Sequence, residues 1–200
     1  MSKKEALTRA AAELLWERGY TGTSPAMILE RAQAGQGSMY HHFSGKAELA
    51  VAAMTRMGDE LRTGVEKALT AEGPALARVA AYLDLERAPL AGCRMGRLAQ
   101  DHDVVADPEL RAPAADFFTW LTARLSAVLA DGVRTGELRP GVDPDAMASL
   151  ITATVQGGYV LARVHQDPAE FHRAIDGAKQ VLAQLTADAD EDRPGHPGHR

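Results

Sequence analysis

The chain has 200 residues, a net charge of -5 at pH 7 and a single cysteine. This length suits one large or two modest cores, and one cysteine excludes an internal disulfide framework and fits a reducing compartment. Apolar residues make up 46% of the sequence and aromatic residues only 5%, a composition that favours helices over strands, so an all-α protein is expected.

Membrane and secretory classes are also disfavoured. No stretch approaches the roughly 18 uninterrupted apolar residues of a membrane-spanning helix. The N-terminal residues run directly into an amphipathic pattern and lack the apolar core of a signal peptide. We therefore expect a cytoplasmic protein with no membrane contact.

Two helices are predicted before residue 33. The first is indicated by apolar residues at helical spacing, namely Leu7, Ala10, Ala11, Leu14 and Leu15. Gly19 ends it, since glycine suits a helix C-terminal cap. Ser24 and Pro25 then start a second helix, the serine as a hydroxyl N-cap and the proline as a first-turn residue.

A tight turn leads into a third short helix at 36–42. On this helix Met39 and Phe43, four residues apart, share an apolar face. The other faces carry hydrogen-bonding side chains that suit phosphate oxygens and base edges, namely Ser38, Tyr40, His41 and His42. Lys46, just after the turn that follows, adds a phosphate-directed charge. The order of elements is that of a helix-turn-helix DNA-binding unit.

Residues 5–50 resemble, without gaps, the N-terminal pattern of the TetR family of transcriptional regulators. The resemblance is carried by the segments Ala10-Ala11, Leu14-Leu15, Glu17-Arg18-Gly19-Tyr20, Gly22-Thr23-Ser24, Arg31-Ala32, Gly37-Ser38-Met39-Tyr40-His41-His42-Phe43 and Lys46-Ala47-Glu48-Leu49. It implies a three-helix DNA-binding domain at 1–48, followed by a helical ligand-binding and dimerisation domain at 49–187. Residues 188–200 are acidic and then rich in Pro, Gly and His, so we expect them to be disordered.

The resemblance also implies roles for individual residues. Phosphate contacts fall to Thr23 and Ser24, base or backbone contacts to Gln36, Gly37 and Ser38, and strand-clamping contacts to Tyr40, His41, His42 and Lys46. Two positions depart from the family pattern. Gln33 stands where the family usually has the turn glycine, which predicts a positive φ at a non-glycine residue. Ala26 stands where an arginine often reaches a base.

The charge is divided between the two predicted domains. Residues 1–50 hold six basic and five acidic residues, a net charge of +1, so the remaining residues carry -6. We expect the weakly positive head to depend on local placement of charge and on two copies in a dimer to bind DNA.

Six further helices are expected after the head, about nine in total. The fourth runs from Lys46 to about Thr70, and the fifth from the Gly73-Pro74 break through Arg87. A short sixth helix opens at Cys93, and Asp-Pro pairs start the last three at 107, 143 and 167. The eighth and ninth carry apolar stripes beside small residues such as Ser149, Ala153 and Gly157, which predicts a homodimer joined through a four-helix bundle.

The stretch 91–101 resembles the ligand-binding domain of the TetR subgroup typified by LmrA, YxaF and NemR. By that arrangement one cavity is lined by Cys93, Arg97, Phe117, Trp120, Gln156 and Tyr159. Because most of these side chains are apolar or aromatic, the effector is expected to be small and largely apolar. Arg97, His102 and Arg163 are the polar candidates for orienting it.

Cys93 leaves several hypotheses open. It is a packed hydrophobe, a thiol that senses electrophiles or oxidants, or the nucleophile of an enzyme with His102 as its base. The sequence holds no catalytic signature, so no enzyme is expected, and no cofactor is predicted. No metal site is predicted either, because His41 and His42 point about 100° apart on a helix. The leading hypothesis is a repressor released from a palindromic double-stranded DNA operator by an effector that shifts the spacing of the two heads.

Overall fold

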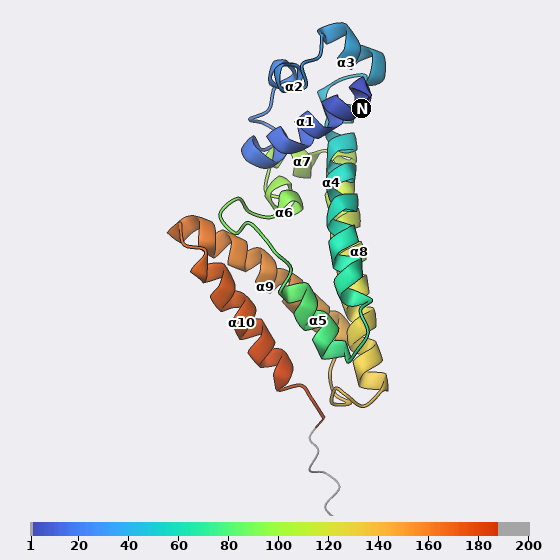
Figure 1. Ribbon diagram of the computed structural model, residues 1–200, viewed down its shortest axis with the longest axis vertical. Helices are drawn as coiled ribbons and strands as arrows, with labels where there is room; N and C mark the ends of the chain where they lie inside the picture. The colour runs from blue at the N-terminus through green and yellow to red at the C-terminus, as the bar shows by residue number, and fades with distance from the viewer. Residues whose placement is uncertain (1, 188–200) are drawn as a thin grey trace, which may run out of the picture.

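The computed structural model describes residues 2–187, which fold into ten helices (Figure 1). They are α1 (Lys3–Arg18), α2 (Pro25–Arg31), α3 (Gln36–His42), α4 (Lys46–Leu69), α5 (Ala75–Leu83), α6 (Arg94–Leu98), α7 (His102–Ala106), α8 (Pro108–Arg134), α9 (Pro144–His165) and α10 (Ala169–Ala183). The all-α prediction is confirmed, and no strand forms within the described range. The tail expected to be disordered, 188–200, lies outside it.

Helices α1 to α3 form a head at one end of the molecule (Figure 1). Ser2 and Glu5 make a reciprocal capping box that starts α1, and Ser24 accepts a hydrogen bond from the Met27 N–H to start α2. The three helices share a core whose members are fully or almost fully buried, namely Leu7, Leu14, Leu15, Ile28, Met39 and Phe43. The first half of α4 packs against α1 and completes this core.

The turn between α2 and α3 contains the predicted positive φ. Gln33 has φ 48°, and the next residue, Ala34, donates its N–H to the Leu29 carbonyl at 3.0 Å. The turn therefore keeps its geometry with glutamine at the position where glycine has no steric cost.

The long helices α4 and α8 lie side by side and run from the head to the far end of the molecule (Figure 1). The predicted inner stripe of α4 is buried at Leu49, Ala53, Met57 and Val65, with Leu61 half-buried. Helix α8 presents Phe117, Leu121, Leu125 and Leu129 to the same core. The α4–α8 pair is the continuous link between the head and the rest of the molecule.

The structure corrects the expected helix number and one helix end. Helix α5 stops at Leu83 rather than at Arg87, because the Arg87 guanidinium turns back and donates to the carbonyls of Tyr82, Leu83 and Leu85. Those carbonyls lie at the helix end, where no further turn supplies donors. The additional helix, which the sequence did not predict, is α7. It is capped by Asp101 and has only five residues, too few to show a periodic pattern of apolar residues.

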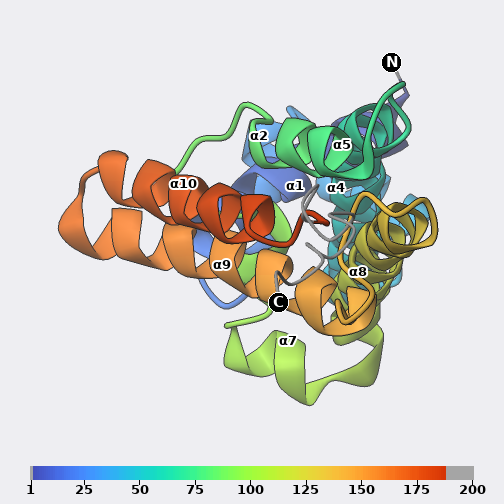
Figure 2. The same cartoon turned by 90° about the horizontal axis from the view of Figure 1, so that it is seen from below.

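Helices α9 and α10 form an antiparallel pair beside the α4–α8 column (Figure 2). Gln166 ends α9 in the left-handed conformation, and the Tyr159 and Phe171 rings pack 4.7 Å apart between the two helices. Large apolar side chains stay exposed on these helices, namely Leu150, Val160, Leu161, Val164 and Val181. Within residues 2–187, none of the helices has the length and apolarity needed to cross a bilayer.

Candidate nucleic-acid interface and effector cavity

Helix α3 presents a polar surface held in place by two buried side chains. Met39 is 0% exposed and Phe43 3% exposed. Gln36, Gly37, Tyr40 and His41 are exposed on the opposite side, whereas Ser38 and His42 are half-buried. The buried pair fixes the rotation of the helix, so the exposed residues form one surface with a phenol, an imidazole and an amide. This surface has the chemistry that direct contact with phosphates and base edges requires.

The two hydroxyl residues before α2 differ in what they offer to DNA. Ser24 is half-buried at the helix N-terminus, where it caps α2. Thr23 is 1% exposed, and its hydroxyl donates to the Gly19 carbonyl at 2.7 Å. The Thr23 hydroxyl therefore closes the α1–α2 loop, and the phosphate contact that the resemblance implies for Thr23 stays a prediction.

Lys46 at the start of α4 faces the body of the protein. Its ammonium lies 3.9 Å from the centroid of the Tyr20 ring. Burial lowers its pKa, while the nearby Asp101 and Asp103 carboxylates oppose that shift. A phosphate contact by Lys46, as the resemblance implies, requires the side chain to leave this cation–π contact.

The head is joined to the body through Trp16, near the C-terminal end of α1. Its indole N–H donates to the Gly92 carbonyl at 3.0 Å, and the Arg94 guanidinium lies 4.6 Å from its ring centroid. The Arg97 guanidinium donates to the Trp16 carbonyl. Three residues in and just before α6 therefore hold one residue of the head.

Asp101, between α6 and α7, makes a second joint to the head. One of its carboxylate oxygens accepts the N–H groups of Tyr20 and Thr21 at 2.9 and 3.1 Å, and the other accepts the Thr21 hydroxyl at 3.1 Å. Burial raises the pKa of Asp101, but the hydrogen bonds from Thr21 and Tyr20 outweigh it, and the net pKa lies below the usual value. The carboxylate is therefore ionised across the physiological range.

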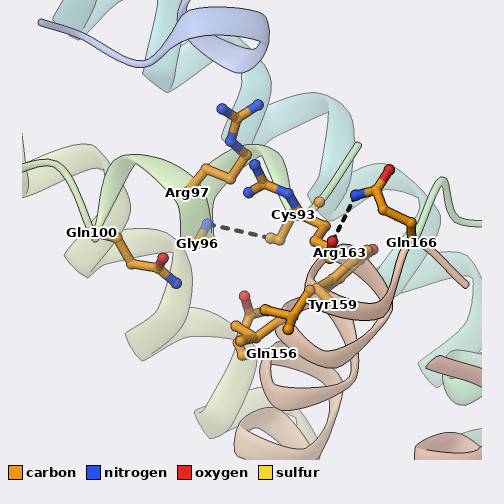
Figure 3. A pocket seen from close by; sticks show the side chains of 11 residues that line it. Cys93, Gly96, Arg97, Gln100, Gln156, Tyr159, Arg163 and Gln166 are labelled. Carbon is orange, nitrogen blue, oxygen red and sulfur yellow. Dashed lines mark hydrogen bonds between the residues drawn. The ribbon is translucent and has the colours of Figure 1, made fainter. Parts of the chain in front are cut away.

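Two adjoining cavities lie behind this junction. The arginine cavity, about 310 Å³, is lined by Gly92, Cys93, Gly96, Arg97 and Gln100 on one side and by 156–166 of α9 and its cap on the other (Figure 3). The apolar cavity, about 280 Å³, is bordered by the charged residues Glu60, Glu86, Arg87 and Arg94 and by apolar side chains that include Trp16, Leu61, Val65, Phe117, Leu121 and Val155. Both share Gly92, Cys93, Gln156 and Tyr159. Together they have the size of a small-molecule site.

The structure brings most of the predicted ligand residues to these cavities. Cys93, Gln156 and Tyr159 line both, Arg97 lines the arginine cavity and Phe117 the apolar one. Trp120 lines neither, which corrects its assignment: its ring packs against Arg62 at 5.4 Å and lies 6.1 Å from the Phe117 ring. Trp120 lies about one turn along α8 from Phe117, but its ring packs under Arg62 of α4 and does not border either cavity.

His102 also falls outside the cavities. It is exposed at the start of α7, so it orients no ligand in either of them and makes no pair with Cys93. The Cys93 sulfur is half-buried and accepts a hydrogen bond from the Gly96 N–H at 3.3 Å (Figure 3). Burial raises the pKa of Tyr159, which keeps its phenol neutral and able to donate to a ligand.

Sequence reasoning missed the tryptophan that does line a cavity. Trp16 belongs to α1 but lies outside the apolar stripe of that helix. A large aromatic residue outside the core-facing stripe could have indicated a contact with another part of the protein. Gly64, on α4, also borders the apolar cavity, and a Cβ at this position would meet nothing within 4 Å. Among residues 2–187 no three His, Cys, Asp or Glu side chains are grouped as metal ligands.

The capped helix α2, the tight turn after it and the polar surface of α3 form the arrangement of a helix-turn-helix DNA-binding protein. Residues 7–53 match the family described as bacterial regulatory proteins, tetR family, and residues 75–178 match the tetracyclin repressor-like C-terminal domain. The chain belongs to the TetR family and is a DNA-binding transcriptional regulator. Members of this family bind operator DNA as dimers and respond to small-molecule effectors.

Individual relatives support the same conclusion. The chain is 27% identical over 175 residues to the transcriptional regulator AcuR of Cereibacter sphaeroides, covering 84% of this chain and 80% of AcuR. A TetR transcriptional regulator of Chloroflexus aurantiacus superposes with a TM-score of 0.83 at 28% identity, covering 94% of this chain and 97% of that one. Reduced NemR of E. coli has a TM-score of 0.80 at 22% identity, covering 94% and 98%. The NemR likeness is one of fold, and the narrower resemblance to its subgroup stays a prediction.

Proposed function

We propose that this regulator is a repressor released from a palindromic operator by a small, largely apolar effector that binds in the apolar cavity. The observation that carries the proposal is the position of Trp16, which lines that cavity, donates to the Gly92 carbonyl just before α6 and accepts a hydrogen bond from Arg97 of α6. A ligand in the cavity therefore touches the head and the body at once. The bound effector favours a position of α6 in which the two heads of the dimer are spaced so that they no longer fit the two half-sites of the operator.

DNA binding by α3 is tested with the promoter DNA upstream of the protein's own coding sequence. Tyr40→Phe removes a hydroxyl from the exposed side chain and should weaken binding to operator and unrelated DNA alike, since phosphate contacts carry no sequence information. Gln36→Ala should instead change the preferred sequence. Fluorescence anisotropy on both DNAs measures each effect, and wild-type affinity in both variants would refute the placement of the interface.

The cavity is tested by filling it. Gly64→Leu places a side chain into the apolar cavity, because nothing lies within 4 Å of the position a Cβ would take. This variant should bind operator but no longer be released by apolar compounds that release the wild type. Thr63→Leu, one residue away and exposed, is the matched control and should respond normally. A normal response in Gly64→Leu would place the effector elsewhere.

The tryptophan assignment gives a direct readout of effector binding. With Trp120→Phe as background, Trp16 is the only tryptophan left, so its emission should change when an apolar compound enters the cavity. Trp16 is also the residue joined to α6, so the same signal reports on the junction with the head. An emission that stays constant with compounds that release DNA contradicts the cavity placement.

A second candidate is a thiol sensor, favoured by one observation: Cys93 is half-buried and borders both cavities. In this case the Cys93 thiolate adds to an electrophile such as a quinone and forms a covalent bond. The attached group then occupies the cavity in place of a reversible ligand. Cys93→Ser should then abolish DNA release by the quinone. Release that persists in this variant supports the reversible effector.

A further inference from the structure

The arginine cavity carries an excess of positive charge. Of the residues that line it, only Arg97 and Arg163 are charged, and no Asp or Glu takes part. Figure 3 shows both guanidinium groups on the same side of the cavity, with that of Arg97 reaching toward α1. Two like charges at one partly buried site are unfavourable unless an anion accompanies them.

Gly92 brings the two arginines together. Its φ is +84°, and a Cβ there would lie 3.2 Å from Cδ of Arg97 and 3.3 Å from Cδ of Arg163. The side chains of Arg97 and Arg163 therefore both pass close to Gly92, where a larger residue would leave no room for them. Burial lowers the pKa of Arg97, and the neighbouring charge of Arg163 lowers it further.

The two guanidinium groups differ in what they already bind. Arg97 donates to the Trp16 carbonyl, a neutral acceptor. Arg163 is half-buried, and among residues 2–187 its guanidinium forms no ion pair or hydrogen bond; only its backbone carbonyl is used, accepting from the Gln166 side chain. Each group thus has N–H donors left for an oxyanion.

The charges around the apolar cavity balance, in contrast, because Glu60 and Glu86 accompany Arg87 and Arg94 in its lining. Arg94 pairs with Glu60 at 3.0 Å, and Arg87 donates to three backbone carbonyls. The uncompensated charge is therefore confined to the arginine cavity, which adjoins an apolar space through Cys93, Gln156 and Tyr159.

We propose that the effector is an amphipathic organic acid whose carboxylate lies between Arg97 and Arg163 while its apolar part extends past Tyr159 into the apolar cavity. The inference rests on the proposed function and makes its effector class specific. Planar guanidinium groups bind carboxylates through paired, charge-assisted hydrogen bonds. The carboxylate competes with the Trp16 carbonyl for Arg97, and this weakens one contact between α6 and the head.

The test compares each acid with its uncharged amide of the same shape. Isothermal titration calorimetry is run on the full-length protein with octanoate against octanamide and with 3-phenylpropanoate against 3-phenylpropanamide. The acids should bind the wild type at least about tenfold more tightly than the amides, the difference expected for a charge-assisted pair. Arg163→Gln should remove that preference, whereas Arg163→Lys should keep part of it because the charge stays. Arg139→Gln, on the exposed α8–α9 connection, is the matched control and should keep all of it.

Each other outcome overturns the inference in a distinguishable way. If acids and amides bind equally well and both still release the operator, the carboxylate contact with the two arginines is refuted, but the proposed function is not. Absence of binding by all four probes overturns the inference, and failure of the Gly64→Leu test independently overturns the proposed function. If Arg163→Gln keeps the preference for acids but sediments as a monomer, Arg163 pairs with the second subunit instead of the ligand.

Discussion

At the scale of single residues, Gln33 carries the backbone strain of the turn between α2 and α3. Its φ of 48° lies in the left-handed region, where a side chain costs roughly 1 kcal/mol relative to glycine. The side chain makes no hydrogen bond among the described residues. The backbone makes two: the Gln33 N–H donates to the Glu30 carbonyl at 3.1 Å, and the Gln33 carbonyl accepts from Lys3 at 3.3 Å. The side chain can therefore be removed without loss of these contacts.

We predict that Gln33→Gly raises the free energy of unfolding by up to about 1 kcal/mol, since the turn loses its strain while the unfolded chain gains some freedom. Urea denaturation followed by circular dichroism measures the change. Gln180→Gly, at an exposed position within α10, is the opposite control and should lower stability by about 1 kcal/mol. A lower stability for Gln33→Gly would mean that the glutamine side chain stabilises the turn.

At the scale of elements, the helices are stabilised at their ends by residues distant in sequence. Helix α5 begins after Pro74 and has no local side-chain cap. Glu137, on the α8–α9 connection, accepts the N–H groups of Ala75 and Leu76 at 2.6 and 2.9 Å. A carboxylate at this end also opposes the positive end of the helix dipole.

Glu137→Gln should lower the free energy of unfolding by about 1 kcal/mol, because an amide has one acceptor oxygen for two N–H groups and no charge. Urea denaturation gives the difference from wild type. The exposed Glu72 lies in the same α4–α5 region, and Glu72→Gln should change stability by less than about 0.5 kcal/mol. Equal effects of the two variants would show that the cap contributes nothing.

Asp101 gives the head–body junction a defined pH dependence. Its pKa is lower in the folded state than its ordinary value of about 3.9. The contribution of the carboxylate is therefore complete above about pH 5 and is lost as the pH falls below about 4. Asp101→Asn should lower stability by about 1–2 kcal/mol at pH 7, and this difference should shrink toward pH 3.

The measurement is a series of urea denaturations between pH 3 and 7 for wild type and Asp101→Asn. Asp116→Asn, at an exposed position of α8, is the control and should show little difference at any pH. A wild-type advantage that persists unchanged at pH 3 would refute the role of the ionised Asp101.

At the scale of the whole molecule, α9 has an apolar face that the single chain leaves uncovered. Leu150 is 49% exposed, Leu161 45% and Val164 72%. The smaller residues Ala153 and Gly157 are exposed between them, so a second helix can approach closely. Apolar patches of this kind rarely stay exposed in soluble proteins, and Val181 extends the patch onto α10.

Leu161→Glu should convert the wild-type dimer into a monomer at micromolar concentration, because it places two charges where two copies of α9 meet. Sedimentation velocity reports the mass. Val105→Glu changes a comparably exposed valine on α7, 42% exposed, and should leave the dimer intact. A dimer in Leu161→Glu would place the interface on another surface.

The helical class, the three helices of the head and the inward direction of Met39 and Phe43 could be predicted from the sequence, because they depend on local periodicity and helix caps. The sequence also predicted the positive φ at Gln33, since the turn constrains the backbone whichever residue occupies it. It missed α7, which is too short to show a period, and the early end of α5, which depends on where the Arg87 side chain turns.

Which residues meet at the cavities could not be predicted, because it depends on how helices distant in the sequence pack together. Trp16 and Gly92 are 76 residues apart, and no local pattern reports a contact over that separation. The same limit explains why Trp120 was assigned to the cavity and Trp16 was not: the direction of each side chain depends on how α1 and α8 are rotated against α4 and α6. The excess charge at Arg97 and Arg163 likewise arises only when α6 and α9 pack across Gly92, which brings two distant arginines to one site.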